Sequence, residues 1–271
     1  MNWIAALPMY NASPALAADW RALLGRAEAR LAGWLAARGD TLSIVEPDGP
    51  LAAFWLRPDL LLSQTCGYPL VHALAGRVQV VATPAFDIDG CAPGRYRSVL
   101  VTGAHVDAPS LDACRGLRAA YNDDDSNSGM NLFRAAVAPL ARARPFFASV
   151  TRTGGHLASL RALAIDRSAD VAAIDCVTFA FVREHLPELA NGVRVIGFTG
   201  DAPGLPFITS NAVAAGDVAR LADALDHAVR DDPALAQRLK LRGFVRLPAD
   251  DYTSILAIER EAVALGYPRL L

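Results

Sequence analysis

The sequence predicts an α/β fold arranged as two lobes. Short apolar runs alternate with segments whose apolar residues recur at helical spacing, which is typical of strands joined by helices in mainly parallel sheets. Two segments rich in proline and glycine, at residues 83–95 and 199–206, interrupt the alternation as hinges would. With 271 residues, 53% hydrophobic and 20% charged, the chain can bury a large core.

The chain opens with an apolar strand and a long amphipathic helix. Ser13 and Pro14 suit the N-cap and first position of that helix, apolar spacing continues to Leu35, and Gly39 is placed to end it. The predicted strands are residues 3–7, 42–45, 60–63, 78–82, 98–101, 117–121, 146–150, 171–174 and 193–198. The further predicted helices are residues 68–75, 127–141, 156–164, 177–185, 212–230, 233–241 and 252–265.

The two hinge-like segments divide the chain into lobes. If the chain leaves one lobe at the first segment and returns at the second, residues 1–95 and 203–271 form lobe I and residues 96–202 form lobe II. We expect the crossings near 86–97 and 198–204. A ligand cleft is then expected between the lobes, at the carboxyl ends of strands.

Charge and hydropathy exclude several classes of protein. The 26 basic and 28 acidic residues give a net charge of −2, which argues against a nucleic-acid-binding protein. No apolar run approaches the roughly 20 residues that span a bilayer. The first residues lack the basic region of a signal peptide, so we expect either a cytoplasmic protein or an exported one whose leader has been removed.

The four cysteines give no sign of a metal or redox site. Cys66, Cys91, Cys114 and Cys176 include no CxxC spacing, so a zinc or thioredoxin-like site is not expected. A chain of this size does not need disulfides for stability. We therefore predict four free thiols.

Polar residues gather at three predicted strand-to-helix junctions. They are SQTCGY at 63–68, NDDDSNSG at 122–129 and TRTGGHLAS at 151–159. Helix N-termini leave N–H groups unpaired and carry about half a positive charge, so hydroxyls and glycines there suit an anion. Asp175 ends another predicted strand, and Tyr10 follows the first.

Each of these residues also has an ordinary structural interpretation. Ser126 and Ser128 can act as N-caps, and so can Asp175. His156 can face solvent or cap its helix, and Tyr10 can simply pack. Their shared placement after strands is what favours a binding site.

Four stretches of the chain resemble the phosphate/phosphite/phosphonate substrate-binding proteins of ABC importers. These proteins have the type II periplasmic-binding-protein fold, with a ligand cleft between two lobes. The resemblance includes a Ser-x-Ser-Gly helix start at 126–129 and a Gly-x-His-x-x-Ser helix start at 154–159. The stretches are GRYRSVLVTG, LDACRGLRAAYNDDDSNSGMNLFRAAV, RTGGHLASLRALAIDRSADVAAIDCVTFAFV and VRVIGFTGDAPGLPFITS.

The resemblance implies a non-catalytic periplasmic protein that captures a small oxyanion by hinge closure. Its partners would be a small anionic ligand and the membrane subunit of an ABC transporter, with no nucleic acid, membrane insertion, metal or cofactor. Serine and histidine donors would bind the anion, and the carboxylate of Asp175 would accept a hydrogen bond from a protonated oxygen or an ammonium. The implied ligand-binding residues are Tyr10, Thr65, Tyr68, Ser126, Asn127, Ser128, His156, Ser159 and Asp175.

Two other functions remain open on the same fold. One is a cytoplasmic enzyme of the menaquinone or thiamine-precursor biosynthesis type, with His156 and Asp175 as acid and base. The other is a ligand-sensing module. The run from Asp123 to Asp125 also places three carboxylates before the anion-binding helix, where they oppose its positive end.

Overall fold

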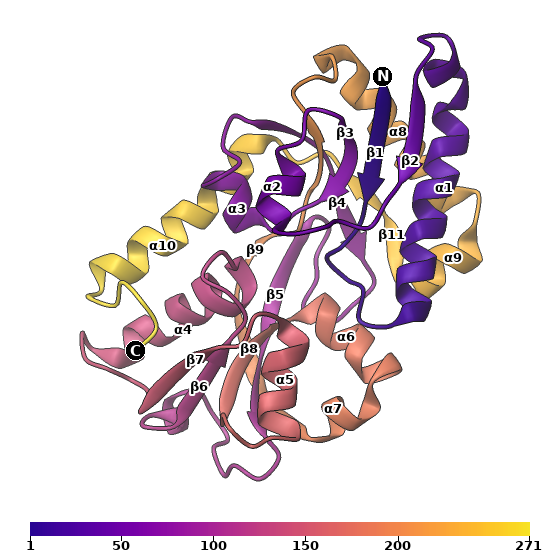
Figure 1. The fold of residues 1–271 in the computed structure, drawn as a ribbon. Helices are drawn as coiled ribbons and strands as arrows, with labels where there is room; N and C mark the ends of the chain where they lie inside the picture. The colour runs from indigo at the N-terminus through magenta and orange to yellow at the C-terminus, as the bar shows by residue number, and fades with distance from the viewer. The chain divides into compact units, whose positions relative to one another are not determined.

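The computed structural model describes all 271 residues, and the chain divides into two compact units. The first unit comprises Met1–Asp87, Ala92–Gly94 and Gly204–Tyr252. The second comprises Ile88–Cys91, Arg95–Pro203 and Thr253–Leu271. Each unit contains one sheet with helices packed on it (Figure 1), so the predicted α/β fold is confirmed. No helix combines the length and apolar character needed to cross a membrane.

A six-stranded sheet forms the centre of the first unit. Its strands are β1 (Asn2–Ala6), β2 (Thr41–Ile44), β3 (Leu60–Gln64), β4 (Val78–Phe86), β10 (Phe207–Ser210) and β11 (Leu241–Val245). The order is β11-β4-β10-β3-β1-β2. β1 pairs in parallel with β2 and β3, whereas β10 and β11 run antiparallel to their neighbours. β3 is buried at every position, as expected for a strand covered on both faces.

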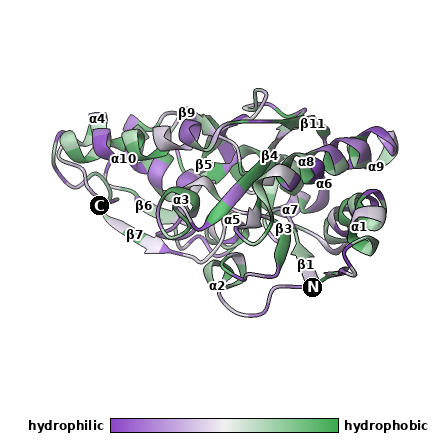
Figure 2. Ribbon diagram, turned by 90° about the horizontal axis from the view of Figure 1, so that it is seen from above, coloured by the Kyte–Doolittle hydropathy of each residue, from purple (hydrophilic) through white to green (hydrophobic).

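The helices of the first unit pack on this sheet. They are α1 (Pro14–Ala36), α2 (Leu51–Trp55), α3 (Gly67–Val71), α8 (Ala215–Arg230) and α9 (Pro233–Arg238). α1 begins where predicted, because Ser13 Oγ accepts a hydrogen bond from Leu16 N at 3.2 Å and Pro14 follows it. α1 packs alongside α8. Figure 2 shows hydrophobic and hydrophilic residues mixed along both helices, as expected when one face is buried and the other is solvated.

A five-stranded sheet forms the centre of the second unit. Its strands are β5 (Arg95–Gly103), β6 (Arg118–Tyr121), β7 (Ser149–Arg152), β8 (Val171–Asp175) and β9 (Val193–Pro203), in the order β7-β6-β8-β5-β9. β6 pairs in parallel with both β7 and β8, and β5 runs antiparallel to β8 and β9. The carboxyl ends of β6, β7 and β8 therefore lie at the same end of the sheet.

Three helices of the second unit begin at that end of the sheet. The helices of this unit are α4 (Leu132–Ala141), α5 (His156–Ala164), α6 (Cys176–His185), α7 (Pro187–Asn191) and α10 (Ser254–Ala264). A π-helical turn, η2 (Asn127–Asn131), runs directly into α4, so the helix predicted at 127–141 is confirmed. Two short 3₁₀ segments are η1 (Asp112–Cys114) and η3 (Ala249–Thr253). α10 packs beside α4 (Figure 1).

The structure corrects several sequence expectations. The sheets are mixed rather than mainly parallel, because β5 pairs with the long strand β9 and because the unpredicted strands β10 and β11 pair antiparallel with β4. The second proline–glycine segment is mostly strand: β9 continues to Pro203, at a sheet edge where proline is tolerated. The strand predicted at 146–150 begins at Ser149, because the backbone N–H groups of Phe146 and Phe147 donate to Leu271 O and not to a neighbouring strand.

The last residues of the chain pack in the second unit rather than with residues 203–252. Tyr267 is 1% exposed, and its hydroxyl donates to Leu271 O at 2.5 Å. Leu271 O in turn accepts hydrogen bonds from the backbone N–H groups of Phe146 and Phe147. The expected grouping of 203–271 in one lobe therefore differs from the structure at Thr253–Leu271.

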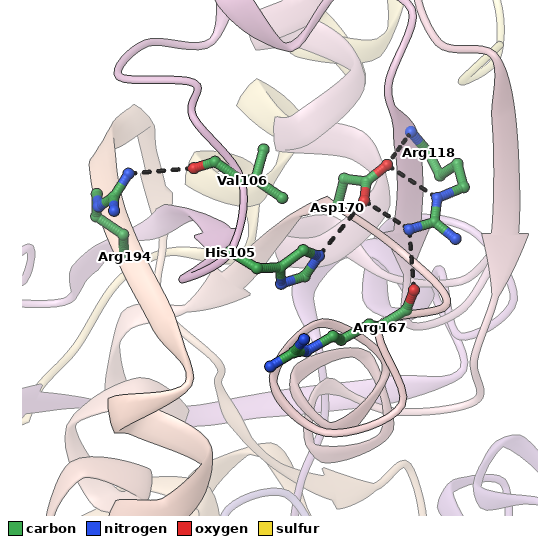
Figure 3. Close-up of polar contacts among 6 residues, drawn as sticks. All are labelled: His105, Val106, Arg118, Arg167, Asp170 and Arg194. Carbon is green, nitrogen blue, oxygen red and sulfur yellow. Dashed lines mark hydrogen bonds and ion pairs between the residues drawn. The ribbon is translucent and has the colours of Figure 1, made fainter.

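A polar cluster lies at the opposite end of the second sheet, where β6 and β8 begin. Asp170 accepts hydrogen bonds from Arg118 N and Nε, both at 2.9 Å, and from Arg118 Nη2 at 2.7 Å. His105 Nε2 lies 3.8 Å from the same carboxylate, and Arg118 also donates to Arg167 O (Figure 3). The hydrogen bonds from Arg118 hold the pKa of Asp170 below its ordinary value. This cluster joins the start of β6 to the residue before β8.

Candidate functional site

Two of the predicted junctions lie side by side in the second unit. β6 and β7 pair in parallel with Tyr121 opposite Arg152, so the loops that follow them leave the sheet together. Thr153 N donates to Tyr121 O at 2.9 Å, and Gly154 N donates to Asn122 O at 2.7 Å. These backbone bonds place the start of α5 beside the start of η2.

Ser126, Ser128 and His156 meet at this point. Ser128 Oγ lies 2.8 Å from His156 Nε2, and Ser126 Oγ lies 3.3 Å from Ser128 Oγ. Ser126 also accepts a hydrogen bond from Gly129 N at 3.0 Å, which makes it the N-cap of η2. Both serines are 4% exposed. The structure therefore brings three of the predicted ligand-binding side chains together at one helix start.

His156 is a neutral side chain in this environment. Burial lowers its pKa to about 4, because desolvation disfavours the imidazolium. A neutral ring has one N–H. If Nε2 carries the proton, the ring donates to Ser128 Oγ, and the hydroxyl protons of Ser126 and Ser128 can point to an anion.

Asn122 and Gly129 are parts of this site that the sequence analysis did not select. Asn122 Oδ1 is buried without a hydrogen-bond partner, and so is His156 Nδ1. A Cβ on Gly129 would lie 2.1 Å from Asn122 Oδ1 and 3.1 Å from His156 Cε1, so glycine permits this close approach. The signal in the sequence was an amide directly after a strand and a glycine in the first turn of the next helix.

The three acidic residues before η2 are partly offset by Arg152. Arg152 Nη1 lies 3.2 Å from Asp124 Oδ2 and 3.5 Å from Asp123 Oδ1. Tyr121 donates its hydroxyl to Asp124 at 2.7 Å. Asp124 and Asp125 are exposed. Their opposition to the positive end of the helix is therefore weakened by both an ion pair and solvent.

Asp175 and Asn127 make structural contacts near the same end of the second sheet. Asp175 Oδ1 caps α6, accepting hydrogen bonds from Val177 N at 2.8 Å and Thr178 N at 3.1 Å. Asp175 pairs with Ser98 across β8 and β5, and Ser98 Oγ donates to Ser128 O at 3.0 Å. Asn127 donates to the Tyr96 hydroxyl at 3.0 Å, inside the core.

Ser159 lies one turn into α5 and is fully buried. Its hydroxyl is 2.7 Å from Thr153 Oγ1, which also contacts Tyr121 O. These contacts stabilise the loop that presents His156. Direct ligand contacts for Ser159, Asn127 and Asp175 stay predictions.

The other predicted residues belong to the first unit. Tyr10 is 4% exposed and packs its ring against Trp20 and Phe86, with centroid distances of 6.1 and 5.6 Å. Thr65 is buried just after β3, where its N–H donates to Pro206 O. Tyr68 is half-buried in α3 and stacks on His72. Their roles toward a ligand stay predictions.

Ser63 is a further residue that the sequence analysis quoted but did not select. It lies near the end of β3 and is fully buried, and its hydroxyl has no hydrogen-bond partner. Such a hydroxyl at a strand end is suited to meet a polar group.

The arrangement at η2 and α5 suits the binding of an anion better than acid–base chemistry. A histidine with a pKa of about 4 is a weak general base at neutral pH. No carboxylate orients its Nδ1 atom, which has no hydrogen-bond partner. No group of three or more His, Cys, Asp or Glu side chains is arranged to hold a metal ion.

Comparison with protein families gives one match that covers most of the chain. A family model described as "ABC transporter, phosphonate, periplasmic substrate-binding protein" matches residues 57–252. This range includes both helix starts described above. No curated protein sequence matches the chain.

Solved structures share the fold at low sequence identity. A binding protein component of an ABC phosphonate transporter from Pseudomonas aeruginosa is 17% identical, with a TM-score of 0.72 over 97% of this chain and 87% of that one. PhnD1 from Prochlorococcus marinus, in complex with methylphosphonate, is 13% identical, with a TM-score of 0.71 over 96% and 97%. XAC2383 from Xanthomonas citri, bound to ATP, is 14% identical, with a TM-score of 0.68 over 97% and 98%.

Proposed function

Because the chain belongs to the phosphonate substrate-binding proteins of ABC transporters, we propose that it captures a phosphonate- or phosphate-like oxyanion without turning it over. The binding residues would be Ser126, Ser128 and His156 in the second unit. The observation that carries this proposal is the contact of Ser128 with a neutral His156 at the start of a helix.

The chemistry of the helix start supports an oxyanion. Tetrahedral oxyanions need several donors, and the two buried hydroxyls at this helix start are suited to supply some of them. No Lys or Arg joins Ser126, Ser128 and His156 in these contacts, so recognition would rest on neutral donors and the helix dipole.

The ligands of the structural relatives support the same class. PhnD1 from Prochlorococcus marinus was solved with methylphosphonate, and XAC2383 from Xanthomonas citri with ATP. Both ligands present tetrahedral phosphorus–oxygen groups. We therefore propose a ligand with such a group, and methylphosphonate is the first compound to test.

Calorimetry with methylphosphonate, phosphite and phosphate tests this proposal. Ser128→Ala is expected to weaken binding by about 1.5–3 kcal/mol, or roughly 10- to 150-fold, because it removes a hydrogen bond to a charged group. Ser110→Ala is the matched control, because Ser110 is exposed and its hydroxyl contacts the N–H of Ala113 in the 3₁₀ segment η1. If none of the three anions binds, or if Ser128→Ala binds as wild type does, the proposed site is wrong.

Closure of the two units on the ligand is also part of the proposal. It would be followed by small-angle X-ray scattering, where saturating ligand is expected to reduce the radius of gyration. An unchanged radius of gyration under saturating ligand would contradict closure and leave the binding site itself untouched. Delivery to an ABC transporter is proposed from the family alone.

A further inference from the structure

Two cysteines far apart in the sequence lie together in the second unit. Cys91 Sγ is 3.4 Å from Cys176 Sγ. Cys91 ends the segment Ile88–Cys91, and Cys176 is the first residue of α6. The sequence analysis found no spacing that suggested a bridge, and all four cysteines are free thiols in the structure. The proximity of this pair is therefore new information from the fold.

The backbone is shaped to allow this approach. Gly90 has a φ of +94°, which residues with side chains rarely adopt. A Cβ there would lie 3.0 Å from Phe198 Cε1 and 3.2 Å from Cys176 Cβ. The segment thus passes directly over the start of α6, and glycine before Cys91 is what permits its thiol to reach Cys176.

We propose that Cys91 and Cys176 form a reversible disulfide that ties the Ile88–Cys91 segment to the start of α6. A disulfide has an S–S distance of about 2.05 Å, so the two sulfurs need to approach by only about 1.3 Å. The family to which the chain belongs is described as periplasmic, and disulfides persist in the bacterial periplasm. This inference does not depend on which ligand the protein binds.

The two thiols have different access to an oxidant. Cys91 is half-buried, whereas Cys176 is 1% exposed. A small disulfide such as oxidised glutathione would react first with the Cys91 thiolate, which forms a mixed disulfide and releases one glutathione thiolate. Cys176 would then lose its proton to that thiolate and attack the Cys91 sulfur, which releases the second glutathione. In total the two cysteines lose two electrons and two protons, and one glutathione disulfide becomes two thiols.

The second step would be the slower one. The hydrogen bond to Cys91, burial and the neighbouring Asp175 raise the pKa of Cys176 in the reduced pair. Burial and Asp175 still do so once Cys91 has become a mixed disulfide. A thiol with a raised pKa supplies little thiolate at neutral pH. Oxidation is therefore expected to accelerate as the pH rises.

The location of the pair suggests a consequence for the chain. Ile88–Cys91 lies between Asp87 and Ala92, which belong to the first unit. The bond would close a covalent link across residues 91–176 within the second unit. Because it constrains the unfolded chain, oxidation is expected to raise the Tm by roughly 5–10 °C.

Thiol counting and peptide mapping of the full chain test the proposal. Protein equilibrated in a series of glutathione redox buffers is denatured, and its free thiols are counted and its peptides mapped by mass spectrometry. Wild type is expected to change from four thiols to two, with a peptide pair linking Cys91 and Cys176 that is lighter by two hydrogens.

Variants at single cysteines make the assignment specific. Cys66→Ser has three thiols and is expected to retain one after oxidation, whereas Cys91→Ser is expected to retain all three. Cys91 is the preferred position for this variant because it is less buried than Cys176. The proposal is overturned if no linked peptide forms in the most oxidising buffer, or if Cys91 accumulates only as a stable adduct with glutathione.

Discussion

At the residue scale, the distinctive feature is a serine–histidine contact that does not resemble a catalytic pair. Ser128 and His156 are 2.8 Å apart, a distance that would suit proton transfer. Yet burial lowers the pKa of His156 to about 4, and its other nitrogen has no orienting partner. Both facts favour a fixed hydrogen-bond donor over a base.

The lowered pKa of His156 has a consequence for stability. An unfolded histidine has a pKa of about 6.5, so between pH 6.5 and 4 the unfolded chain binds a proton that the folded chain does not. The free energy of unfolding therefore falls as pH falls through this window, and the loss is complete below about pH 4. We expect His156 to contribute a loss of about 2 kcal/mol between pH 7 and pH 4.5.

Urea unfolding at these two pH values measures this loss. The carboxylates of the chain also titrate at low pH, so the comparison is between wild type and His156→Gln. The variant is expected to lose about 2 kcal/mol less than wild type between pH 7 and pH 4.5. His227→Gln serves as control, since the side chain of His227 on α8 is half-buried. Equal losses in wild type and His156→Gln would mean that His156 is not desolvated.

Gly129 gives a second prediction at this scale. In Gly129→Ala the new Cβ would meet Asn122 Oδ1 at 2.1 Å and Asn122 Cγ at 2.8 Å. Asn122 must then move, so we expect a loss of about 1–3 kcal/mol in unfolding free energy, together with weaker anion binding.

Gly33→Ala is the matched control for this substitution. Gly33 is exposed in α1, and nothing lies within 4 Å of a Cβ added there. That variant is expected to gain about 0.5–1 kcal/mol from helix propensity. Chemical denaturation and calorimetry of both variants check the pair. A Gly129→Ala protein as stable as wild type would show that Asn122 is free to rearrange.

At the scale of elements, the second sheet depends on polar contacts at one of its ends as well as on apolar burial. Asp170 joins β6 to β8 through three hydrogen bonds with Arg118 and lies near His105 (Figure 3). Asp170 is 8% exposed, so its carboxylate depends on these partners. The cluster lies at the end of the sheet opposite the helix starts that we propose as the ligand-binding site.

Asp170→Asn is therefore expected to lower stability without changing ligand affinity. We expect a loss of about 1–3 kcal/mol, because the side chain loses its negative charge and one of the two oxygens that accept hydrogen bonds from Arg118. Since the pKa of Asp170 is held below its ordinary value, this contribution is present above about pH 4 and is lost as pH falls through the lowered pKa.

The control is Asp112→Asn, which breaks an exposed pair. Asp112 lies 3.3 Å from Arg115, and its side chain is 69% exposed. Its loss is expected to stay within about 0.5 kcal/mol. Guanidinium-induced unfolding at pH 7 compares the two variants. The interpretation fails if both variants lose the same amount.

The elements show which parts of the fold a sequence can predict. α5 begins at His156 and ends at Ala164, as expected from its apolar spacing. β10 was missed because Phe207–Ser210 is only four residues long and follows Pro206, so its strand pairing depends on β3 and β4. β9 was cut short because the motif TGDAPGLP is typical of a turn, whereas pairing with β5 extends the strand to Pro203.

The site shows the same division between local and long-range information. Ser126, Ser128 and His156 were predicted because each follows a strand, and the parallel pairing of β6 and β7 brings them together. Asn122 was not predicted as a site residue, because its place in the site depends on the close approach of Gly129, which the sequence does not show. The proximity of Cys91 and Cys176 was not predicted, because 84 residues separate them and only the fold makes them neighbours.

At the scale of the whole molecule, the chain enters the second unit more often than the two expected crossings imply. Besides Arg95–Pro203, this unit takes up Thr253–Leu271. Within this last segment, Ile255 is fully buried and its carbonyl accepts a hydrogen bond from Asn131 Nδ2 at 3.3 Å. Arg134 Nη1 donates to Pro268 O at 2.8 Å. Residues distant in sequence thus complete the core beside α4.

Ile255→Ala is expected to destabilise the second unit rather than the residues that precede it in sequence. Removing a buried isoleucine costs about 2–5 kcal/mol. Hydrogen exchange measured by mass spectrometry would locate the loss: exchange should accelerate in peptides from α4, whereas β10 and α8 should keep their protection. Leu235→Ala in α9 is the matched control, since Leu235 is 1% exposed in the first unit. Its effect is expected on α8 and β11. If Ile255→Ala instead accelerates exchange equally in both units, the two units unfold as one cooperative unit, and this prediction is wrong.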